Sequence, residues 1–594
     1  MAGYCFLARF TALACIFVAS FLAERTVCAQ TQTKIRSSST LVLVPVSALD
    51  KSGHFVPGLN AKDFQILVDN KPVEIKNFDA VTEDSLTPAG MSEANAPLPP
   101  GTFRNISESS VSQPNLVILF IDYMNTRLVD RMGLREGMLK YLATQLKPEQ
   151  EIAAYGLTDR LVLLQPFTRD PSALIAVARD LLKQKGQPRE PIEGKPLVKP
   201  GMDPITYTKA NGIDAGVQFL EALNARKEFN LDQLHRAQRT LEAFRELAGS
   251  FGGIPGKKTV IWLTGDASPL NPSMLYRILV NDRSAETVPT PWWQMAKTYE
   301  ALNAAGISIF PLDTRGITNS GLLSAGNELT HDQFQQTVRA SQPDDLTSYA
   351  NATDQREGEA ANAGLAMTAV AKETGGTVLA GSNNIDELLG RAQRLWSSYY
   401  VLAFVPERPA ENSPPAYHKI KVSVDHRGVQ ILARRGYVSL PEGLISADAE
   451  IQRDLVEAAT SPVDLSSVAL RLNLRESPAT ERTRHYPFSV KVSSALLGTA
   501  TEKGAPFDMT IAILVRDQDG KFDAPIGKRL RGTLPQAAID NVKANGMQYD
   551  AEFETPSSGR YFGRVIVRDN LTGRIGTITL TLPTAAGAAQ QNLF

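Results

Sequence analysis

Three aspartates stand where a sheet would present them to a ligand. Asp122, Asp266 and Asp313 each follow a run of apolar residues that has the length of a buried strand. The carboxyl ends of parallel strands meet at one edge of a sheet, and open α/β sheets bind their ligands there. Carboxylate and hydroxyl oxygens are the ligands that Mg²⁺ prefers. The sequence therefore indicates a candidate magnesium site, with Asp122 and Asp266 facing one crevice.

A second interpretation of the same aspartates involves no metal. Carboxylates at the ends of strands commonly cap the amino terminus of the following helix or accept hydrogen bonds from loop amides. Asp122 and Asp266 suit that structural role equally well. The residue types leave both interpretations open.

The elements that would position these aspartates are buried strands alternating with helices. Residues 115–121, NLVILFI, form an almost unbroken apolar run, which is typical of a parallel strand buried on both faces. Residues 259–263 and 307–312 have the same character, and segments with helical spacing lie between the three runs. This alternation predicts an α/β fold with a doubly wound, mostly parallel sheet.

Strands of another kind flank this region. Residues 40–79 and 399–437 have the pattern of short strands with turns, and we expect the two groups to pair with each other. Beyond residue 460, six evenly spaced strands separated by turn residues predict an all-β, immunoglobulin-like sandwich. The chain is therefore expected to contain more than one domain, as its length of 594 residues also indicates.

Changes in composition suggest where these parts begin and end. Segments rich in Pro, Ser and Gly without hydrophobic periodicity indicate linkers or insertions. The expected division is a signal peptide at 1–29, an N-terminal β unit at 36–80, a linker at 81–113, an α/β domain at 114–398 with insertions near 183–230 and 318–362, β-strands at 399–440 that pair with the N-terminal unit, a helical linker at 447–460 and a β-sandwich at 461–584.

The amino terminus has the pattern of a secretory signal peptide. Arg9 precedes the apolar run Phe10–Ala23, and small residues at Val27 and Ala29 fit a cleavage site after Ala29. No later segment approaches 18 consecutive apolar residues, so no membrane span is expected after cleavage. We expect an exported protein, periplasmic or extracellular. All three cysteines of the sequence lie within the leader, which excludes disulfides and thiol chemistry from the mature chain.

Charge and motifs narrow the classes of function. The chain has 62 Lys and Arg against 63 Asp and Glu, so its overall charge does not favour nucleic acid as a partner. The six histidines show no HExxH spacing, and neither a GxSxG nucleophile motif nor a GxGxxG phosphate loop occurs. These absences weigh against the common hydrolases and nucleotide-binding enzymes.

Four motifs in a fixed order resemble those of a known family. They are NLVILFIDYMNT, PGKKTVIWLTGD, ALNAAGISIFPLDTRG, and ETGGTVLA followed by YYVLAFVP. In this order the chain resembles the von Willebrand factor A (VWA) domains, and more closely the VWFA-related group of secreted acidobacterial proteins. The resemblance covers about Val42 to Val438. It implies a VWA-like α/β domain that binds other proteins.

The resemblance also implies a metal-ion-dependent adhesion site, written Asp-x-Ser-x-Ser after the first strand. Asp122 keeps the first position and Thr126 replaces the last Ser as a hydroxyl ligand, but Met124 occupies the middle position. A thioether is a poor ligand for Mg²⁺, so one hydroxyl is missing. Asn125 offers an amide oxygen one residue out of register, and Thr168 is a candidate for the separate threonine of the family.

The function expected from these observations is protein binding or adhesion by an exported, non-enzymatic protein. The surface would be the carboxyl edge of the sheet, with or without a bridging Mg²⁺ held by Asp122, Thr126 and Asp266, beside Asn125 and Asp313. Two alternatives remain. One is a metal-assisted hydrolase that uses the same aspartates, and the other is a structural protein of the cell envelope.

Overall fold

The structure is a computed structural model of the chain. It describes residues 41–82, 98–106, 115–147, 150–183, 208–209, 213–254, 256–271, 291–317, 362–407, 416–439, 448–478, 480, 482–493, 497, 504–521 and 526–582. The expected signal peptide and most of the expected insertion near 318–362 lie outside these residues.

The described strands form five sheets, and this corrects the expected fold class. Four of the sheets are antiparallel throughout, and only one contains parallel pairs. A doubly wound, mostly parallel sheet with flanking strands is therefore the wrong fold class for this chain. The apolar runs did mark parallel strands, but the far more numerous strands outside them pair antiparallel, through hairpins and across long stretches of sequence.

The sheet with parallel pairs, called the central sheet here, has the order β10-β9-β6-β7-β8. Its strands are β6 (Asn115–Asp122), β7 (Ile152–Leu157), β8 (Leu161–Thr168), β9 (Lys257–Thr264) and β10 (Ile307–Asp313). The pairs β10·β9, β9·β6 and β6·β7 are parallel, whereas β7 and β8 pair antiparallel. Leu379 joins this sheet only through an isolated parallel bridge to Leu312.

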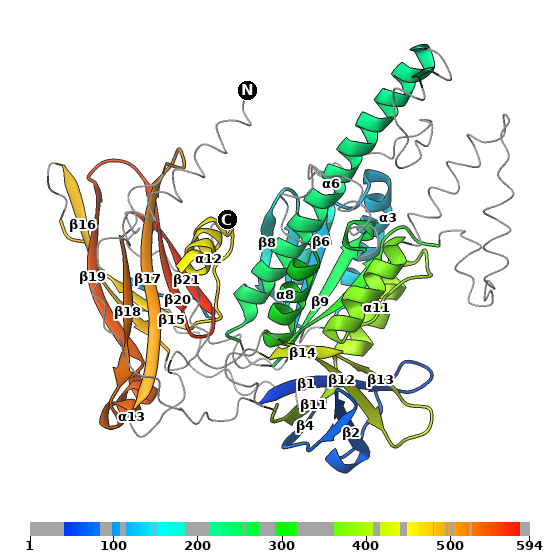
Figure 1. Cartoon of the computed structure of the whole chain (residues 1–594), viewed down its shortest axis with the longest axis horizontal. Coiled ribbons are helices and arrows are strands. Elements are labelled where there is room, and N and C mark those ends of the chain that lie inside the picture. The colour runs from blue at the N-terminus through cyan, green and yellow to red at the C-terminus, as the bar shows by residue number, and fades with distance from the viewer. Residues whose placement is uncertain are drawn as a thin grey trace, which may run out of the picture.

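Helices cover both faces of the central sheet (Figure 1). One face packs against α6 (Ile213–Phe251), α8 (Pro291–Ala304) and a helix over residues 362–374, and the other against α3 (Leu128–Thr144), α4 (Pro171–Asp180) and α11 (Ile385–Trp396). Alternate residues of β6 enter the two cores, with Phe120 on the α6 side and Leu119 on the α3 side. This is why the apolar run is unbroken. α6 begins within the expected insertion and extends beyond the sheet (Figure 1).

The N-terminal β unit consists of two antiparallel sheets that share one core. Their orders are β13-β1-β11-β4 and β14-β12-β2-β3. The strands are β1 (Val42–Leu49), β2 (Phe64–Val68), β3 (Lys71–Val73), β4 (Asn77–Val81), β11 (Tyr399–Phe404), β12 (Ala416–Val424), β13 (Gln430–Ala433) and β14 (Gly436–Ser439), and a short 3-10 helix, η1 (Ala61–Asp63), precedes β2. Strands from before and after the central sheet are thus hydrogen-bonded to each other.

The C-terminal β unit also encloses one core between two antiparallel sheets, β19-β16-β15-β5 and β18-β17-β20-β21. Its elements are α12 (Asp448–Thr460), β15 (Leu470–Leu474), β16 (Thr483–Val492), β17 (Ala505–Asp517), β18 (Ile526–Leu534), α13 (Gln536–Asn545), β19 (Met547–Pro556), β20 (Tyr561–Asp569) and β21 (Ile575–Leu582). Its remaining strand is β5 (Thr102–Arg104), where Phe103 lies opposite Leu472.

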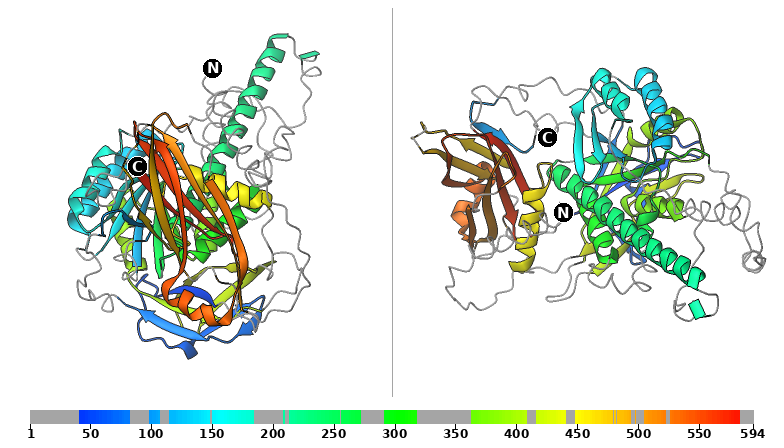
Figure 2. Two further views of the ribbon diagram at one scale, coloured as in Figure 1. Left: turned by 90° about the vertical axis from the view of Figure 1, so that its left-hand side faces the viewer. Right: turned by 90° about the horizontal axis from the view of Figure 1, so that it is seen from above.

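β5 lies inside the segment 81–113, which was expected to be a linker. Its three residues are too few to give a periodic pattern, so the sequence offered no signal for a strand that pairs with residues more than 350 positions later. Figure 2 shows this strand, in blue, beside the sheets of the C-terminal β unit. Within the described residues, no helix is both long and apolar enough to cross a membrane.

Candidate functional site

The carboxylate of Asp122 lies at the carboxyl end of β6 and is fully buried. Its Oδ1 accepts hydrogen bonds from the backbone N–H of Asn125 at 3.0 Å and from the Asn125 amide nitrogen at 3.1 Å. Its Oδ2 accepts from the same amide nitrogen at 2.9 Å, from the indole N–H of Trp262 at 3.0 Å and from the hydroxyl of Thr264 at 3.1 Å. Both oxygens are therefore surrounded by donors of the protein itself.

Burial and hydrogen bonding act in opposite directions on this group. Burial raises the pKa of Asp122 to about 6, because a dry environment disfavours the charged form. The donors on Asn125, Trp262 and Thr264 lower the same pKa, since they stabilise the carboxylate. The five hydrogen bonds therefore stabilise the ionised form of Asp122 against the effect of burial.

The loop after β6 is held in place by buried polar contacts. Thr126 Oγ1 accepts a hydrogen bond of 3.0 Å from the backbone N–H of Gly265, in the loop after β9. The amide nitrogen of Asn125 also contacts the hydroxyl of Thr240 on α6, at 3.2 Å. The amide oxygen of Asn125 is buried without a hydrogen-bond partner among the described residues. The side chain of Met124 packs against the core on the α6 side.

Arg131 on α3 holds this loop through hydrogen bonds to its carbonyl oxygens. Its Nε donates to the carbonyl oxygen of Thr126 at 3.0 Å, and its Nη2 donates to the carbonyl oxygen of Tyr123. The guanidinium carbon lies 5.2 Å from the centre of the Tyr123 ring, and the whole side chain is buried. Sequence analysis missed Arg131, although a charged residue in the core-facing register of Leu134 and Met138 was a usable signal.

The other two aspartates are engaged separately. The carboxylate of Asp313 pairs with both ends of the Arg315 guanidinium, at 2.9 and 2.6 Å. Asp266 Oδ1 accepts from the backbone N–H of Ser268 at 2.8 Å, and burial raises the pKa of Asp266. The hydroxyl of Thr264 links the two loops, since it also lies 3.3 Å from the carbonyl oxygen of Asp266. The aspartates thus lie at the same edge of the sheet, but each accepts hydrogen bonds from different groups.

Thr168 lies at the opposite edge of the central sheet. It pairs with Ile152, the first residue of β7, because β8 runs antiparallel to the other four strands. Its hydroxyl accepts a hydrogen bond of 3.0 Å from the backbone N–H of Asp170. Thr168 therefore belongs to the turn before α4 and is no part of the site.

The residues at this edge do not fit a magnesium ion. A metal at Asp122 would have to displace the N–H donors of Asn125 and Trp262, which point at the same oxygens. Met124 supplies no oxygen, and Thr126 is already bonded to Gly265. Among the described residues, no group of three or more His, Cys, Asp or Glu side chains has a geometry that would hold a metal. The oxygens of Asp122 are instead occupied by amide, indole and hydroxyl donors of the protein itself.

The surface beside this network is apolar. Leu128, Val129 and Met132, in the first turns of α3, are 59%, 58% and 55% exposed. They follow Arg127, whose guanidinium pairs with Asp130 through two contacts of 2.9 and 3.1 Å. We call these five residues the α3 surface. Because α3 starts directly after the Asp122 loop, the α3 surface lies at the carboxyl edge of the central sheet.

Comparisons with known proteins add little. No family model and no curated protein matches the sequence. Among solved structures, an aerotolerance-related membrane protein of Bacteroides fragilis matches at 11% identity over 47% of this chain and 98% of its own, with a TM-score of 0.22. The pilus adhesin SpaC of Lactobacillus rhamnosus GG matches at 9% identity over 79% and 53%, with a TM-score of 0.23. TM-scores this low assign neither a family nor a function.

Proposed function

We propose that this chain is an exported protein that binds another protein through the α3 surface, without a metal ion. The observation that carries the proposal is the exposure of Leu128, Val129 and Met132 in consecutive turns of one helix. Contiguous apolar side chains rimmed by charged ones mark interaction sites more often than single exposed residues do. The resemblance to VWA domains supports the same edge of the sheet as the binding edge.

The Asp122 network supports a structural role for this edge. It fixes the loop 123–126, and Arg131 ties that loop to α3. A binding surface whose backbone is already fixed loses less conformational entropy when a partner docks. The network thus serves the α3 surface by positioning the start of α3.

The chemistry of the α3 surface indicates the kind of partner. Its apolar residues require apolar side chains on the partner. Arg127 is half exposed, and it stands at the amino terminus of α3, where the helix dipole is positive. Asp130 of the same turn supplies the carboxylate that these features favour, because it pairs with Arg127 at 2.9 and 3.1 Å. The proposed partner is therefore a protein with an apolar patch that matches Leu128, Val129 and Met132.

The alternative of a metal-assisted hydrolase is less well supported. Such an enzyme needs a carboxylate that is available to a metal or to the attacking water. Asp122 accepts five hydrogen bonds and Asp313 is paired with Arg315. No specific contact favours the third possibility, a purely structural envelope protein.

The proposal is tested by capture of partners from an envelope extract with the tagged chain. Met132→Glu is expected to abolish the capture, because it places a charge in the apolar contact. Ile526→Glu, at an exposed apolar residue of β18, is the matched control and should capture normally. Equal capture by both variants would exclude the α3 surface as the binding site.

A further inference from the structure

The last turns of α6 form a close joint with the C-terminal β unit. The backbone N–H of Ser466 donates to the carbonyl oxygen of Gly249 at 2.8 Å, and the hydroxyl of Ser466 donates to the carbonyl oxygen of Ser250. A Cβ at Gly253 would lie 1.8 Å from the carbonyl oxygen of Ser466, so only glycine permits this approach. The joint is thus built from backbone contacts that tolerate little separation.

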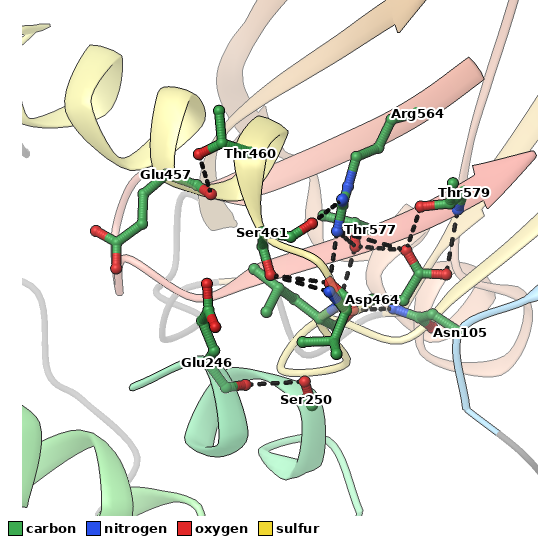
Figure 3. Close-up of polar contacts among 12 residues, drawn as sticks. Asn105, Glu246, Ser250, Glu457, Thr460, Ser461, Asp464, Arg564, Thr577 and Thr579 are labelled. Carbon is green, nitrogen blue, oxygen red and sulfur yellow. Dashed lines mark hydrogen bonds and ion pairs between the residues drawn. The ribbon is translucent and has the colours of Figure 1, made fainter. Parts of the chain in front are cut away.

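Arg564 of β20 organises the other side of the joint. Its guanidinium donates to the carbonyl oxygens of Ser461 and Val463 and, at 3.3 Å, to the hydroxyl of Thr577. It lies 3.6 Å from the carboxylate of Asp464, and the side chain is buried (Figure 3). Arg564 therefore holds the segment that contacts α6 through its two terminal nitrogens, while its Nε is buried without a hydrogen-bond partner among the described residues.

Glu246 of α6 faces this joint with an unpaired carboxylate. Burial and neighbouring charges act on this carboxylate, and no hydrogen bond from a described residue contributes; Figure 3 shows it between α6 and the Ser461 segment. The nearby Arg245 is engaged with Glu457 of α12 at 3.4 Å and with the hydroxyl of Thr298 of α8 at 3.1 Å. Both cations beside Glu246 thus have other partners.

Two further carboxylates act on Glu246 through their negative charge. Glu457 comes from α12, and Glu242 lies one turn earlier on α6, where it accepts hydrogen bonds of 2.9 Å from Gln238 and Arg239. The charged groups around Glu246 are therefore Glu242 and Arg245 on its own helix, Glu457 on α12, Arg564 on β20 and Asp464 beside Arg564. When Glu246 is ionised, it adds a third negative charge to a half-buried cluster.

We infer that Glu246 is the proton-binding group of a pH-sensitive latch between α6 and the C-terminal β unit. The latch is closed when the Glu246 carboxyl group carries its proton and is weakened when it is ionised. This device is distinct from the α3 surface and does not depend on the proposed binding function.

The electrostatics of Glu246 give the direction of the effect. Burial, followed by the charges of Glu457 and Glu242, raises the pKa of Glu246 to about 8, and the neighbouring arginines oppose this rise only in part. An opened joint would return Glu246 to water and to an ordinary pKa of about 4.3. Because the closed form binds the proton more tightly, the closing equilibrium is strongest at low pH. It falls by up to about tenfold per pH unit as the pH rises toward 8.

The test is hydrogen exchange of the full chain between about pH 6 and about pH 8. The reporter is the amide of Ser466, which donates across the joint. Glu246→Gln is the reference protein at each pH, because glutamine mimics the protonated acid and the intrinsic exchange rate cancels in the comparison. The protection of Ser466 in the wild type, divided by that in Glu246→Gln, should fall about tenfold per pH unit. A constant ratio would overturn the latch.

Two further variants separate the latch from a general effect of pH. Glu457→Gln removes one neighbouring charge, so the decline in protection should end at a lower pH than in the wild type. A profile identical to the wild type would contradict the assigned role of the cluster. Glu221→Gln, at an exposed position of the same helix, should behave as the wild type. If it also removed the pH dependence, the effect would not lie at Glu246.

Discussion

The indole N–H of Trp262 donates a hydrogen bond of 3.0 Å to Oδ2 of Asp122. Trp262 lies on β9 opposite Phe120, two residues before the end of β6, so its long side chain reaches the carboxylate at the strand end. Indole is only a donor, and here it occupies an oxygen that a metal would otherwise need. This contact, with those of Asn125 and Thr264, makes Asp122 a structural carboxylate.

Removing the indole donor should destabilise the chain. Trp262→Phe is expected to lower the free energy of unfolding by about 2–4 kcal/mol, because it leaves a buried carboxylate short of one donor and also removes volume. Urea unfolding measures this. Trp396→Phe is the matched control, since its buried indole donates to the neutral Gln150 side chain at 3.2 Å. If Trp262→Phe lost less unfolding free energy than Trp396→Phe, the claim that the indole of Trp262 stabilises a charged carboxylate would be contradicted.

The chain should be indifferent to magnesium. A ligand that binds only the folded state raises its melting temperature by mass action. Because the Asp122 oxygens already accept five hydrogen bonds, millimolar Mg²⁺ or Mn²⁺ should give the same Tm as a chelator in thermal unfolding. Met124→Ser restores the missing hydroxyl, yet it should not create a shift either. A metal-dependent rise in the wild type, lost in Asp122→Ala, would show that metal binds here.

Lys257 should make stability increase at alkaline pH. Its buried Nζ lies 3.3 Å from the Ser47 hydroxyl and 5.0 Å from the centre of the Tyr399 ring, and burial lowers its pKa to about 8. The unfolded chain, with an ordinary lysine pKa of about 10.4, holds the proton more tightly in this range. The free energy of unfolding should therefore rise between about pH 8 and about pH 10.4, by up to about 3 kcal/mol from this group.

Lys257→Met separates this contribution from that of Lys258, whose pKa burial also lowers to about 8. The variant should retain only part of the alkaline rise in urea unfolding. An unchanged rise would mean that Lys257 is not the group responsible.

The joint should be sensitive to a single methyl group. Gly253→Ala places a Cβ against the Ser466 carbonyl oxygen, so the backbone of one side must move. We expect a loss of unfolding free energy of at least about 2 kcal/mol, comparable to overpacking a core, together with faster amide exchange in residues 463–467. Gly133→Ala, on α3 with open space around the added atom, should be neutral or slightly stabilising. Equal effects of the two substitutions would contradict the close approach.

The local character of the strands was more predictable from the sequence than their arrangement. The apolar run of β6 identified a parallel strand buried on both faces. Its residues point alternately into the core on the α6 side and the core on the α3 side. The extension to a doubly wound, mostly parallel sheet was wrong. Among the described strands only three pairs are parallel. The strand order of the other sheets depends on pairings such as Phe103 with Leu472, which local periodicity cannot report.

The position of the site was predictable, and the metal-free interpretation, in which Asp122 and Asp266 accept hydrogen bonds from loop amides, agrees with the contacts to the N–H groups of Asn125 and Ser268. Asp122, Asn125 and Thr126 do lie together at the carboxyl edge of the central sheet. The donors that fill the Asp122 oxygens include Trp262, an apolar residue in a strand whose pattern indicated only burial. Leu128, Val129 and Met132 are exposed although they are apolar. Helical spacing shows that a helix is amphipathic, but it does not show which apolar residues the rest of the chain covers.

The central claim is that the α3 surface binds a protein without metal, and site-specific photo-crosslinking tests it most directly. A photoreactive phenylalanine analogue would replace Leu128, and the native cells would be irradiated with magnesium or with a chelator present. A control variant of the same chain would carry the analogue at Ile526 instead. We predict a discrete crosslinked product from position 128 only, of equal yield in both conditions. No product from position 128, or a product that disappears with the chelator, would contradict the account.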